Sequence, residues 1–301
     1  MKNFMPIKSL QKYPKVSFVF PTMNRRKDVV RLLKSIYSLE YPKDKIEIIM
    51  ADNCSSDDTV SVVRKEFPKV KIIENKYNFG TSIAFNQLVE KSIGDYIFML
   101  DDDEIFEKNC LRIMMESSLK NPNIVFATGL FYYNDKKRIR NLGGKLNPFF
   151  GLKSTIRGKN EINIGKYKGV EVEIIAGGTL LIKKEIFDDI GGFDERYFLS
   201  HDDIDWEIRL KKKGYKIVVI PEAIIYHNHK LNEKPSPFYE YHLIRGKTIL
   251  LKKHSFWFLP LWVIYILIAS RSILKIKGMF AGLFSPKKIY YTKDFKRLIK
   301  E

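Results

Sequence analysis

The chain has 301 residues, of which 45% are hydrophobic, so it can form one large domain or two small ones around a substantial core. Its two cysteines, Cys54 and Cys110, show no metal-binding or disulfide spacing, which favours a reducing cytosolic compartment and leaves a single disulfide as the alternative. The first 15 residues are polar and basic, so we expect no secretory signal.

The formal net charge of +18 is concentrated in two windows. Residues 134–170 carry ten Lys or Arg against two acids, and residues 271–301 carry nine against two. Basic windows attract nucleic acid, anionic lipid or phosphorylated substrates. A generally lysine-rich surface is the alternative explanation.

The N-terminal half alternates between short apolar runs and helical patterns. Residues 16–20 predict a buried strand, and Asn24 can cap the following helix, whose apolar residues recur with helical spacing. The alternation continues with strands predicted at 46–50, 70–74 and 96–100 and helices at 59–67 and 82–93. It predicts an α/β fold with a Rossmann-like, mostly parallel sheet and helices on both faces.

Polar residues follow the predicted strands. Ligands of open α/β sheets bind outside the carboxyl ends of the strands, so these residues are expected to share one crevice. They are Thr22 and Asn24, Asp52 and Asn53, Asn78 and Gly80, and Asp101–Asp103.

Asp101–Asp103 close the apolar run 96–100. Crowded carboxylates repel one another, and a hard cation such as Mg²⁺ or Mn²⁺ relieves that repulsion. The alternative is a solvated acidic turn. His227 ends another apolar run, residues 223–226, and is a candidate third metal ligand.

Asp52 ends the second predicted strand, where an acid can accept hydrogen bonds from a ribose hydroxyl or a base N–H. The run 52–57 can instead cap the helix that begins near Thr59. Gly80 is expected to permit a close backbone approach or a turn with positive φ. Because no glycine-rich loop follows the first strand, a dinucleotide-binding domain and a P-loop enzyme are disfavoured.

The second half is less regular. Residues 134–168 are expected to form an excursion over the site rather than part of the core, followed by a strand at 172–183 and a short helix at 184–190. Asp202 and Asp203 fall in the first turn of a further predicted helix. They can complement the helix dipole there, or one can act as a general base.

The segment 256–269 is uncharged and contains two tryptophans, with Lys252 and Lys253 before it and Lys275 and Lys277 after it. Fourteen residues are fewer than the roughly 20 that a transmembrane helix needs. The pattern favours an apolar helix lying on a membrane surface; a buried core or dimer helix is the alternative.

The ordered set of motifs over residues 15–250 resembles the family 2 glycosyltransferases of the GT-A fold, particularly the rhamnosyl- and galactofuranosyltransferase-like members. The tail carries an echo of the resemblance at residues 277–283. The motifs are Pro21-Thr-x-Asn-Arg25, Asp52-Asn-x-Ser-x-Asp57, Asn78-x-Gly80, Asp101–Asp103, Ala176-Gly-Gly178, Gly191-Gly-Phe-Asp-Glu195, Asp202-Asp-x-Asp205, His227 and Tyr241-x₃-Arg245.

The resemblance implies a role for each matching residue. Pro21, Thr22, Asn24, Arg25, Asp52 and Asn53 would bind the nucleotide, with Thr22, Asn24 and Asp52 at its base and ribose. Asn78, Gly80, Asp101, Asp102, Gly177 and Gly178 would complete the donor site. Asp101, Asp103 and His227 would hold Mg²⁺ or Mn²⁺, Asp203 would be the catalytic base with Asp202 as the alternative, and Arg245 and Trp206 would contact the acceptor or a phosphate.

The resemblance also implies an inverting transfer of a sugar from a UDP-, dTDP- or GDP-linked donor to a glycan, either free or linked to polyprenyl diphosphate. Residues 1–250 would form the GT-A domain and residues 251–301 a membrane-associating helix and basic tail. We expect a peripheral protein on the cytoplasmic face of the cell membrane, possible homo-oligomers and no nucleic-acid partner. The alternatives are another metal-dependent nucleotide-sugar enzyme, such as a nucleotidyltransferase, and a basic RNA- or lipid-binding module without catalysis.

Overall fold

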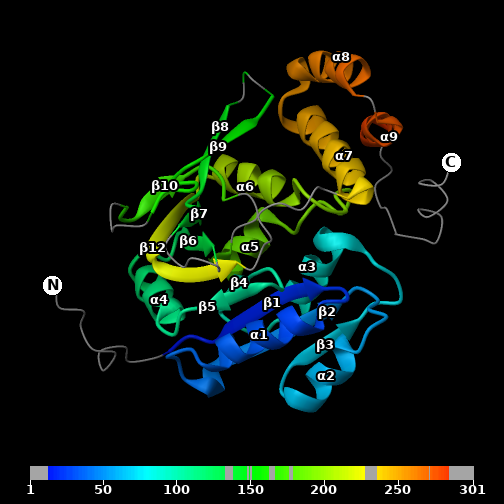
Figure 1. Cartoon of the computed structure of the whole chain (residues 1–301). Coiled ribbons are helices and arrows are strands. Elements are labelled where there is room, and N and C mark those ends of the chain that lie inside the picture. Colours follow the sequence, from blue (N-terminus) through cyan, green and yellow to red (C-terminus); the bar gives the residue numbers. More distant parts are fainter. Residues whose placement is uncertain are drawn as a thin grey trace.

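The structure, a computed structural model, describes residues 13–132, 138–147, 149, 151–162, 167–175, 179–227, 236–270 and 272–284. Most of its strands join one central sheet, in the order β10-β12-β6-β11-β4-β1-β2-β3, with β5 beside β12 and β7 beside β6 (Figure 1). The strands are β1 (Val16–Thr22), β2 (Ile46–Asp52), β3 (Lys71–Glu74), β4 (Tyr96–Met99), β5 (Glu104–Phe106), β6 (Ile124–Tyr132), β7 (Ile139–Asn141), β10 (Val170–Val172), β11 (Leu180–Lys183) and β12 (Lys216–His227).

The first half of the sheet is parallel, as the sequence predicts. β1 pairs in parallel with both β2 and β4, and β2 pairs in parallel with β3. Beyond β4 the sheet becomes mixed, because β11 runs antiparallel to both β4 and β6. The carboxyl ends of β1, β2 and β4 therefore meet at one edge, where their polar residues gather.

Helices cover both faces, and side chains alternate between two cores along each strand. In β1, Val16, Phe18 and Phe20 face one core, whereas Val19 faces the other. The first core also receives α1 (Arg26–Tyr37), α2 (Thr59–Glu66) and α4 (Cys110–Lys120). The second core receives α3 (Gly80–Lys91), α5 (Lys184–Ile190) and α6 (Asp202–Lys212). The predicted α/β arrangement with two covered faces is confirmed.

Two predictions for the second half are wrong in part. The strand expected over 172–183 is not continuous: β10 ends at Val172, β11 begins at Leu180, and residues 176–178 lie outside the described part. The excursion expected over 134–168 does contribute to the core, because Ile139 and Leu142 are fully buried against the sheet. It also contains a separate hairpin of β8 (Gly144–Asn147) and β9 (Lys153–Ile156).

Three helices follow the sheet and gather at one end of the molecule (Figure 1). They are α7 (Pro237–His254), α8 (Leu259–Ala269) and α9 (Ile273–Leu283). Gly278 and Gly282 let α9 lie against α7, because a Cβ at these positions would meet Tyr241 O at 2.6 Å and Arg245 O at 2.7 Å. The domain boundary expected after residue 250 falls inside α7.

α8 is apolar and only lightly packed. Leu261, Ile264 and Ile268 expose 58%, 52% and 81% of their surfaces. Pro260 lies in the first turn, where its missing N–H costs nothing, so it begins the helix rather than breaking it. Among the described helices, none combines the length and apolar character required to cross a membrane.

Candidate active site

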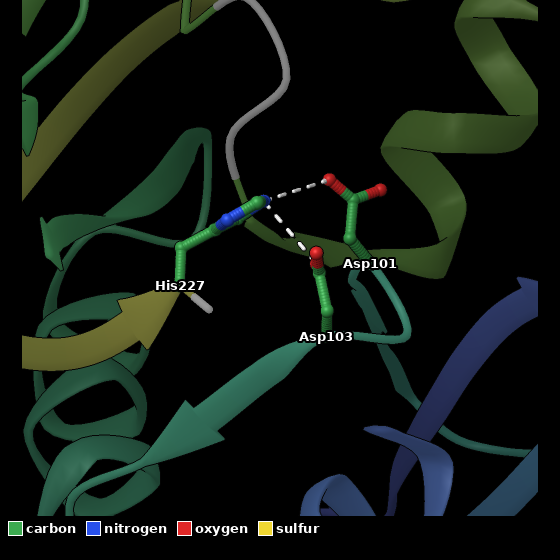
Figure 2. Close-up of side chains that lie close together, drawn as sticks. All are labelled: Asp101, Asp103 and His227. Carbon is green, nitrogen blue, oxygen red and sulfur yellow. Dashed lines mark ion pairs between the residues drawn. The ribbon is translucent and has the colours of Figure 1, made fainter. Parts of the chain in front are cut away.

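Two aspartates and a histidine converge at the edge of the sheet. Asp101 follows β4, Asp103 precedes β5, and His227 ends β12, whose pairing with β5 places His227 opposite Glu104. Nε2 of His227 lies 3.2 Å from Asp103 Oδ1 and 3.8 Å from Asp101 Oδ2 (Figure 2). One ligand atom from each residue falls within a 4.8 Å group.

The donor set of this cluster fits a divalent cation. Carboxylate oxygens suit Mg²⁺ and Mn²⁺, whereas an imidazole nitrogen favours a transition metal, so the mixed set suits Mn²⁺ best. Asp103 and His227 are buried, and Asp101 is exposed toward the cavity. The three residues that the sequence predicted as metal ligands therefore lie together in a geometry that can hold an ion.

Asp102 points to a different set of partners. It accepts a 2.7 Å hydrogen bond from Thr22 Oγ1, and Arg25 Nε lies 3.5 Å from its other oxygen. Burial raises the pKa of Asp102 to about 7, against the opposing effects of Arg25 and Thr22. Arg25 also lies 3.4 Å from Asp103, so one guanidinium offsets part of the negative charge of the aspartate run.

A cavity of about 430 Å³ opens over this cluster. Its lining brings together most of the residues predicted to bind the donor. They are Pro21, Thr22, Arg25, Asn53, Asn78, Gly80, Asp101, Asp102, Asp103 and His227.

Asn24 and Asp52 do not line this cavity; they shape the loop beside it. Asn24, with a positive φ of 55°, accepts a 2.7 Å hydrogen bond from Ser56 N. Asp52 is 3% exposed and accepts a 2.9 Å hydrogen bond from Ser55 N through Oδ2. Asp52 therefore helps to hold the loop that leads into α2, and it does not cap that helix directly, because the N-cap residue is Asp58.

Gly80 fulfils both expectations for a glycine. Its φ is +77°, and an added Cβ would lie 2.1 Å from Phe198 O. Asn78 Oδ1 accepts a 2.9 Å hydrogen bond from Gly80 N, which fixes the turn that begins α3. The close approach of Gly80 to Phe198 O brings the start of α3 against the loop that leads into α6.

A second cavity, of about 400 Å³, adjoins the first, and Asp101 lines both. Asp202 and Asp203 line the second cavity from the first turn of α6. Asp202 is buried and accepts hydrogen bonds from Thr81 Oγ1 at 2.6 Å and Ser82 Oγ at 3.3 Å. Burial raises the pKa of Asp202, which these hydroxyls partly oppose. Asp203 is more exposed, and its Oδ1 accepts from Ile204 N at 2.8 Å.

The start of α6 is held in a constrained conformation. Ser200 and His201 have φ values of 69° and 66°, in a region of backbone conformation that residues other than glycine rarely adopt. Gly246 of α7 packs against them so closely that a Cβ would lie 2.8 Å from Ser200 O. The glycine that follows Arg245 therefore lets α7 support the segment carrying both candidate bases.

The remaining predicted residues have mixed positions. Trp206 lines the second cavity, is fully buried, and donates a 3.0 Å hydrogen bond from its indole N–H to Gly191 O. Arg245 lines neither cavity: it is 1% exposed, and its Nη1 donates to Arg196 O at 2.6 Å. Burial lowers the pKa of Arg245 to about 10. Gly177 and Gly178 lie outside the described residues.

Sequence reasoning did not identify four residues that line both cavities: Thr81, Arg140 of β7, Leu199 and Tyr239 of α7. Tyr239 belongs to the first turn of a helix that the sequence pattern did not predict. Arg140 lies in the basic window 134–170, whose charge indicates an anionic ligand but does not indicate which of its basic residues lines the site.

The fold defines a class of protein. The solved structure of GalNAc-T7 with UDP, GalNAc and Mn²⁺ superposes with a TM-score of 0.69, covering 97% of this chain and 57% of that one, at 14% sequence identity. Its likeness establishes the GT-A glycosyltransferase fold for this chain.

Sequence comparison gives the family. The glycosyl transferase family 2 profile matches residues 17–191, more than half of the chain, so the chain belongs to glycosyl transferase family 2. The probable glycosyltransferase YdaM of Bacillus subtilis is 28% identical over 222 residues, which are 72% of this chain and 51% of that protein. The N-acetylglucosaminyl-diphospho-decaprenol L-rhamnosyltransferase of Mycobacterium tuberculosis is 24% identical over 266 residues, covering 77% of this chain and 84% of that protein. The chain therefore spans about half the length of the first relative and most of the second.

Proposed function

We propose that this chain is an inverting, divalent-metal-dependent glycosyltransferase that moves a sugar from a nucleoside-diphosphate donor to a glycan hydroxyl. The observation that carries the proposal is the pair of adjoining cavities. One holds the Asp101–Asp103–His227 cluster, the other holds Asp202 and Asp203, and Asp101 lines both. A donor bound beside the cluster would present its sugar to the second cavity.

The nucleotide would occupy the cavity lined by Thr22, Asn53 and Asn78. Asp52 lies beside the loop that leads into α2, and its Oδ1 is buried and lacks a hydrogen-bond partner among the described residues. A base or ribose donor that reached this oxygen would satisfy it, since a buried acceptor without a partner is costly. UDP-, dTDP- and GDP-linked donors all carry suitable groups.

Asp101, Asp103 and His227 would hold Mg²⁺ or Mn²⁺, which when bound offsets the negative charge of the donor diphosphate and of the departing nucleoside diphosphate. The protein's own part is to keep the three ligands together before the ion arrives. The pairing of β5 with β12 does this, because it fixes His227 beside Asp103.

Asp203 is the proposed base. Its carboxylate would take the proton from the acceptor hydroxyl while that oxygen forms a bond to the anomeric carbon. The bond from that carbon to the diphosphate oxygen breaks, and its electron pair leaves with the diphosphate. One displacement inverts the anomeric centre without a protein nucleophile. Asp202 is the weaker candidate, because two hydroxyls already occupy its buried carboxylate.

The proposed acceptor is a glycan on a polyprenyl-diphosphate lipid. The mycobacterial relative is named for a decaprenyl-diphosphate substrate, and this chain carries a lightly packed apolar helix, α8, with exposed Leu261, Ile264 and Ile268. Apolar side chains that insert into a bilayer surface would bring the cavities near such a lipid. We therefore place the enzyme peripherally on the inner face of the cell membrane.

A transfer assay tests this function. The full-length protein is incubated with Mn²⁺, an N-acetylglucosaminyl-diphospho-polyprenol and a panel of UDP-, dTDP- and GDP-linked sugars. We expect one donor to give a glycosylated lipid whose new linkage, read by NMR coupling constants, has the anomeric configuration opposite to that of the donor. A product that retains the donor configuration would overturn the mechanism, and transfer that is equal with EDTA would overturn the metal requirement.

A further inference from the structure

Arg140 occupies the junction of the two cavities. It is half-buried on β7 and lines both of them, together with Asp101 and Tyr239. Burial raises the pKa of the Glu104 carboxyl well above its ordinary value, and the positive charge of Arg140 acts to lower it. Within the described part of the chain, however, no carboxylate lies within the 4.0 Å ion-pair distance of the Arg140 guanidinium.

The strand around Arg140 fixes where its side chain begins. Ile139 is fully buried in the second core, and Asn141 is 4% exposed. Asn141 donates to Ile175 O and accepts a 2.7 Å hydrogen bond from Gly143 N. Because alternate residues of a strand face opposite sides, these two anchors direct Arg140 away from the core and toward the cavities.

The other guanidinium that lines the first cavity already has acidic partners. Arg25 lies 3.5 Å from Asp102 and 3.4 Å from Asp103. Arg140 has no such partner among the described residues, so its charge is available to an anionic ligand. A guanidinium presents paired N–H donors that match the oxygens of a phosphate.

We propose that Arg140 binds the donor diphosphate at the phosphate attached to the sugar. This inference rests on the proposed function. The diphosphate would lie beside Asp101 and Asp103, and the sugar would face Asp203, so the phosphate between them falls at the junction that Arg140 lines. As the sugar–oxygen bond breaks, the electron pair stays on that phosphate, and Arg140 stabilises the developing charge.

Calorimetry with inorganic pyrophosphate and Mn²⁺ tests this contact without turnover or an acceptor. Arg140→Met removes the charge and keeps most of the side-chain length. Arg138→Met is the matched control, because Arg138 is exposed two residues away, donates to Asn160 O, and lines neither cavity. We expect Arg140→Met to weaken pyrophosphate binding about tenfold or more, whereas Arg138→Met binds like the wild type. Arg140→Lys should recover part of the affinity, which a folding defect would not allow.

Equal pyrophosphate binding by the wild type and Arg140→Met overturns the role of Arg140 and leaves the proposed function standing. Absence of Mn²⁺-dependent pyrophosphate binding in the wild type overturns the proposed metal site itself, and with it this inference. In the transfer assay we expect kcat for Arg140→Met to fall about 100-fold, with a small change in KM for the acceptor. An effect confined to the KM for the lipid diphosphate would assign Arg140 to the acceptor and overturn the proposal.

Discussion

Nε2 of His227 lies 3.2 Å from Oδ1 of Asp103, although the two residues come from opposite halves of the chain. The contact follows from the pairing of β5 with β12, which sets His227 opposite Glu104. The ligand cluster is thus built by backbone register, and changes to its side chains should affect binding more than folding.

Asp203→Asn should separate chemistry from donor binding. We expect kcat to fall about 10³-fold, because positioned bases contribute roughly 10² to 10⁴. The affinity for nucleoside diphosphate with Mn²⁺ should stay unchanged, as calorimetry would show. Near-wild-type turnover would remove Asp203 from the mechanism.

Asp202→Asn is the comparison for that experiment. It weakens the hydrogen bonds that Thr81 and Ser82 donate to a buried carboxylate. We expect a loss of about 1–3 kcal/mol in the free energy of unfolding, measured by urea denaturation, and a smaller loss of kcat than in Asp203→Asn. The reverse order of the two kcat values would make Asp202 the base.

Gly246→Ala should displace the candidate bases although Gly246 lines neither cavity. Its Cβ would lie 2.8 Å from Ser200 O, and the positive-φ segment at Ser200 and His201 would have to shift. We expect a stability loss of about 1–3 kcal/mol and at least a tenfold fall in kcat. Lys252→Ala, an exposed position on the same helix, is the control. Wild-type kinetics in Gly246→Ala would show that this contact does not position the candidate bases.

Asp205 should contribute to stability in a pH-dependent way. It is fully buried and lies 2.5 Å from Lys253 Nζ, 2.8 Å from His254 Nε2 and 3.1 Å from Arg209 Nε. Burial raises the pKa of Asp205, but hydrogen bonds from His254 and Lys253 outweigh it, so the net pKa is lowered.

A lowered carboxyl pKa stabilises the fold fully above its unfolded value, near 4, and the contribution is lost as pH falls toward the folded value. We expect Asp205→Asn to cost about 3 kcal/mol at pH 7 and progressively less below pH 4. Denaturation curves from about pH 7 to pH 3 would check this, with the exposed Asp44→Asn as control. A difference that grows on acidification would contradict the assignment.

The exposed apolar side chains of α8 should carry membrane binding. Replacing Leu261 and Ile268 together by Ser should reduce co-sedimentation with phosphatidylcholine–phosphatidylglycerol vesicles more than tenfold, since burying each is worth roughly 1.5–3 kcal/mol. Ile93→Ser is the control, because Ile93 is 59% exposed but lies far from α8 in the sequence. Equal vesicle binding by the double variant and the wild type would exclude this face.

The part of the site that sequence predicts best is the part that strand ends determine. Asp101, Asp103 and His227 each adjoin an apolar run that ends at the same edge of the sheet, so their meeting follows from topology. The role of Gly80 could also be predicted, because a glycine just before a helix indicates a positive φ or a close backbone approach, which here is the approach of Phe198 O.

The parts of the site that depend on long-range packing could not be predicted as well from the sequence. β7 has three residues, too few to show a period, so the cavity position of Arg140 could not be read from its neighbours. Arg245 matches a motif, but its surroundings come from the packing of α7, which buries it beside Arg196 O. The hydrogen bonds that Asn24 Oδ1 and Asp52 Oδ2 accept from the adjoining loop could not be foreseen either, because they depend on how that loop folds back, and the role of both residues in nucleotide binding stays a prediction.

The most direct measurement of the central claim is calorimetry of UDP, dTDP and GDP binding, with Mn²⁺ and with EDTA, to the wild type, Asp103→Ala and the control Asp44→Asn. We predict that at least one nucleotide binds the wild type and Asp44→Asn only when Mn²⁺ is present, and that Asp103→Ala weakens this binding at least tenfold. Nucleotide binding that is unchanged by EDTA, or an unaltered Mn²⁺ response in Asp103→Ala, would contradict a metal-bridged diphosphate at Asp101, Asp103 and His227.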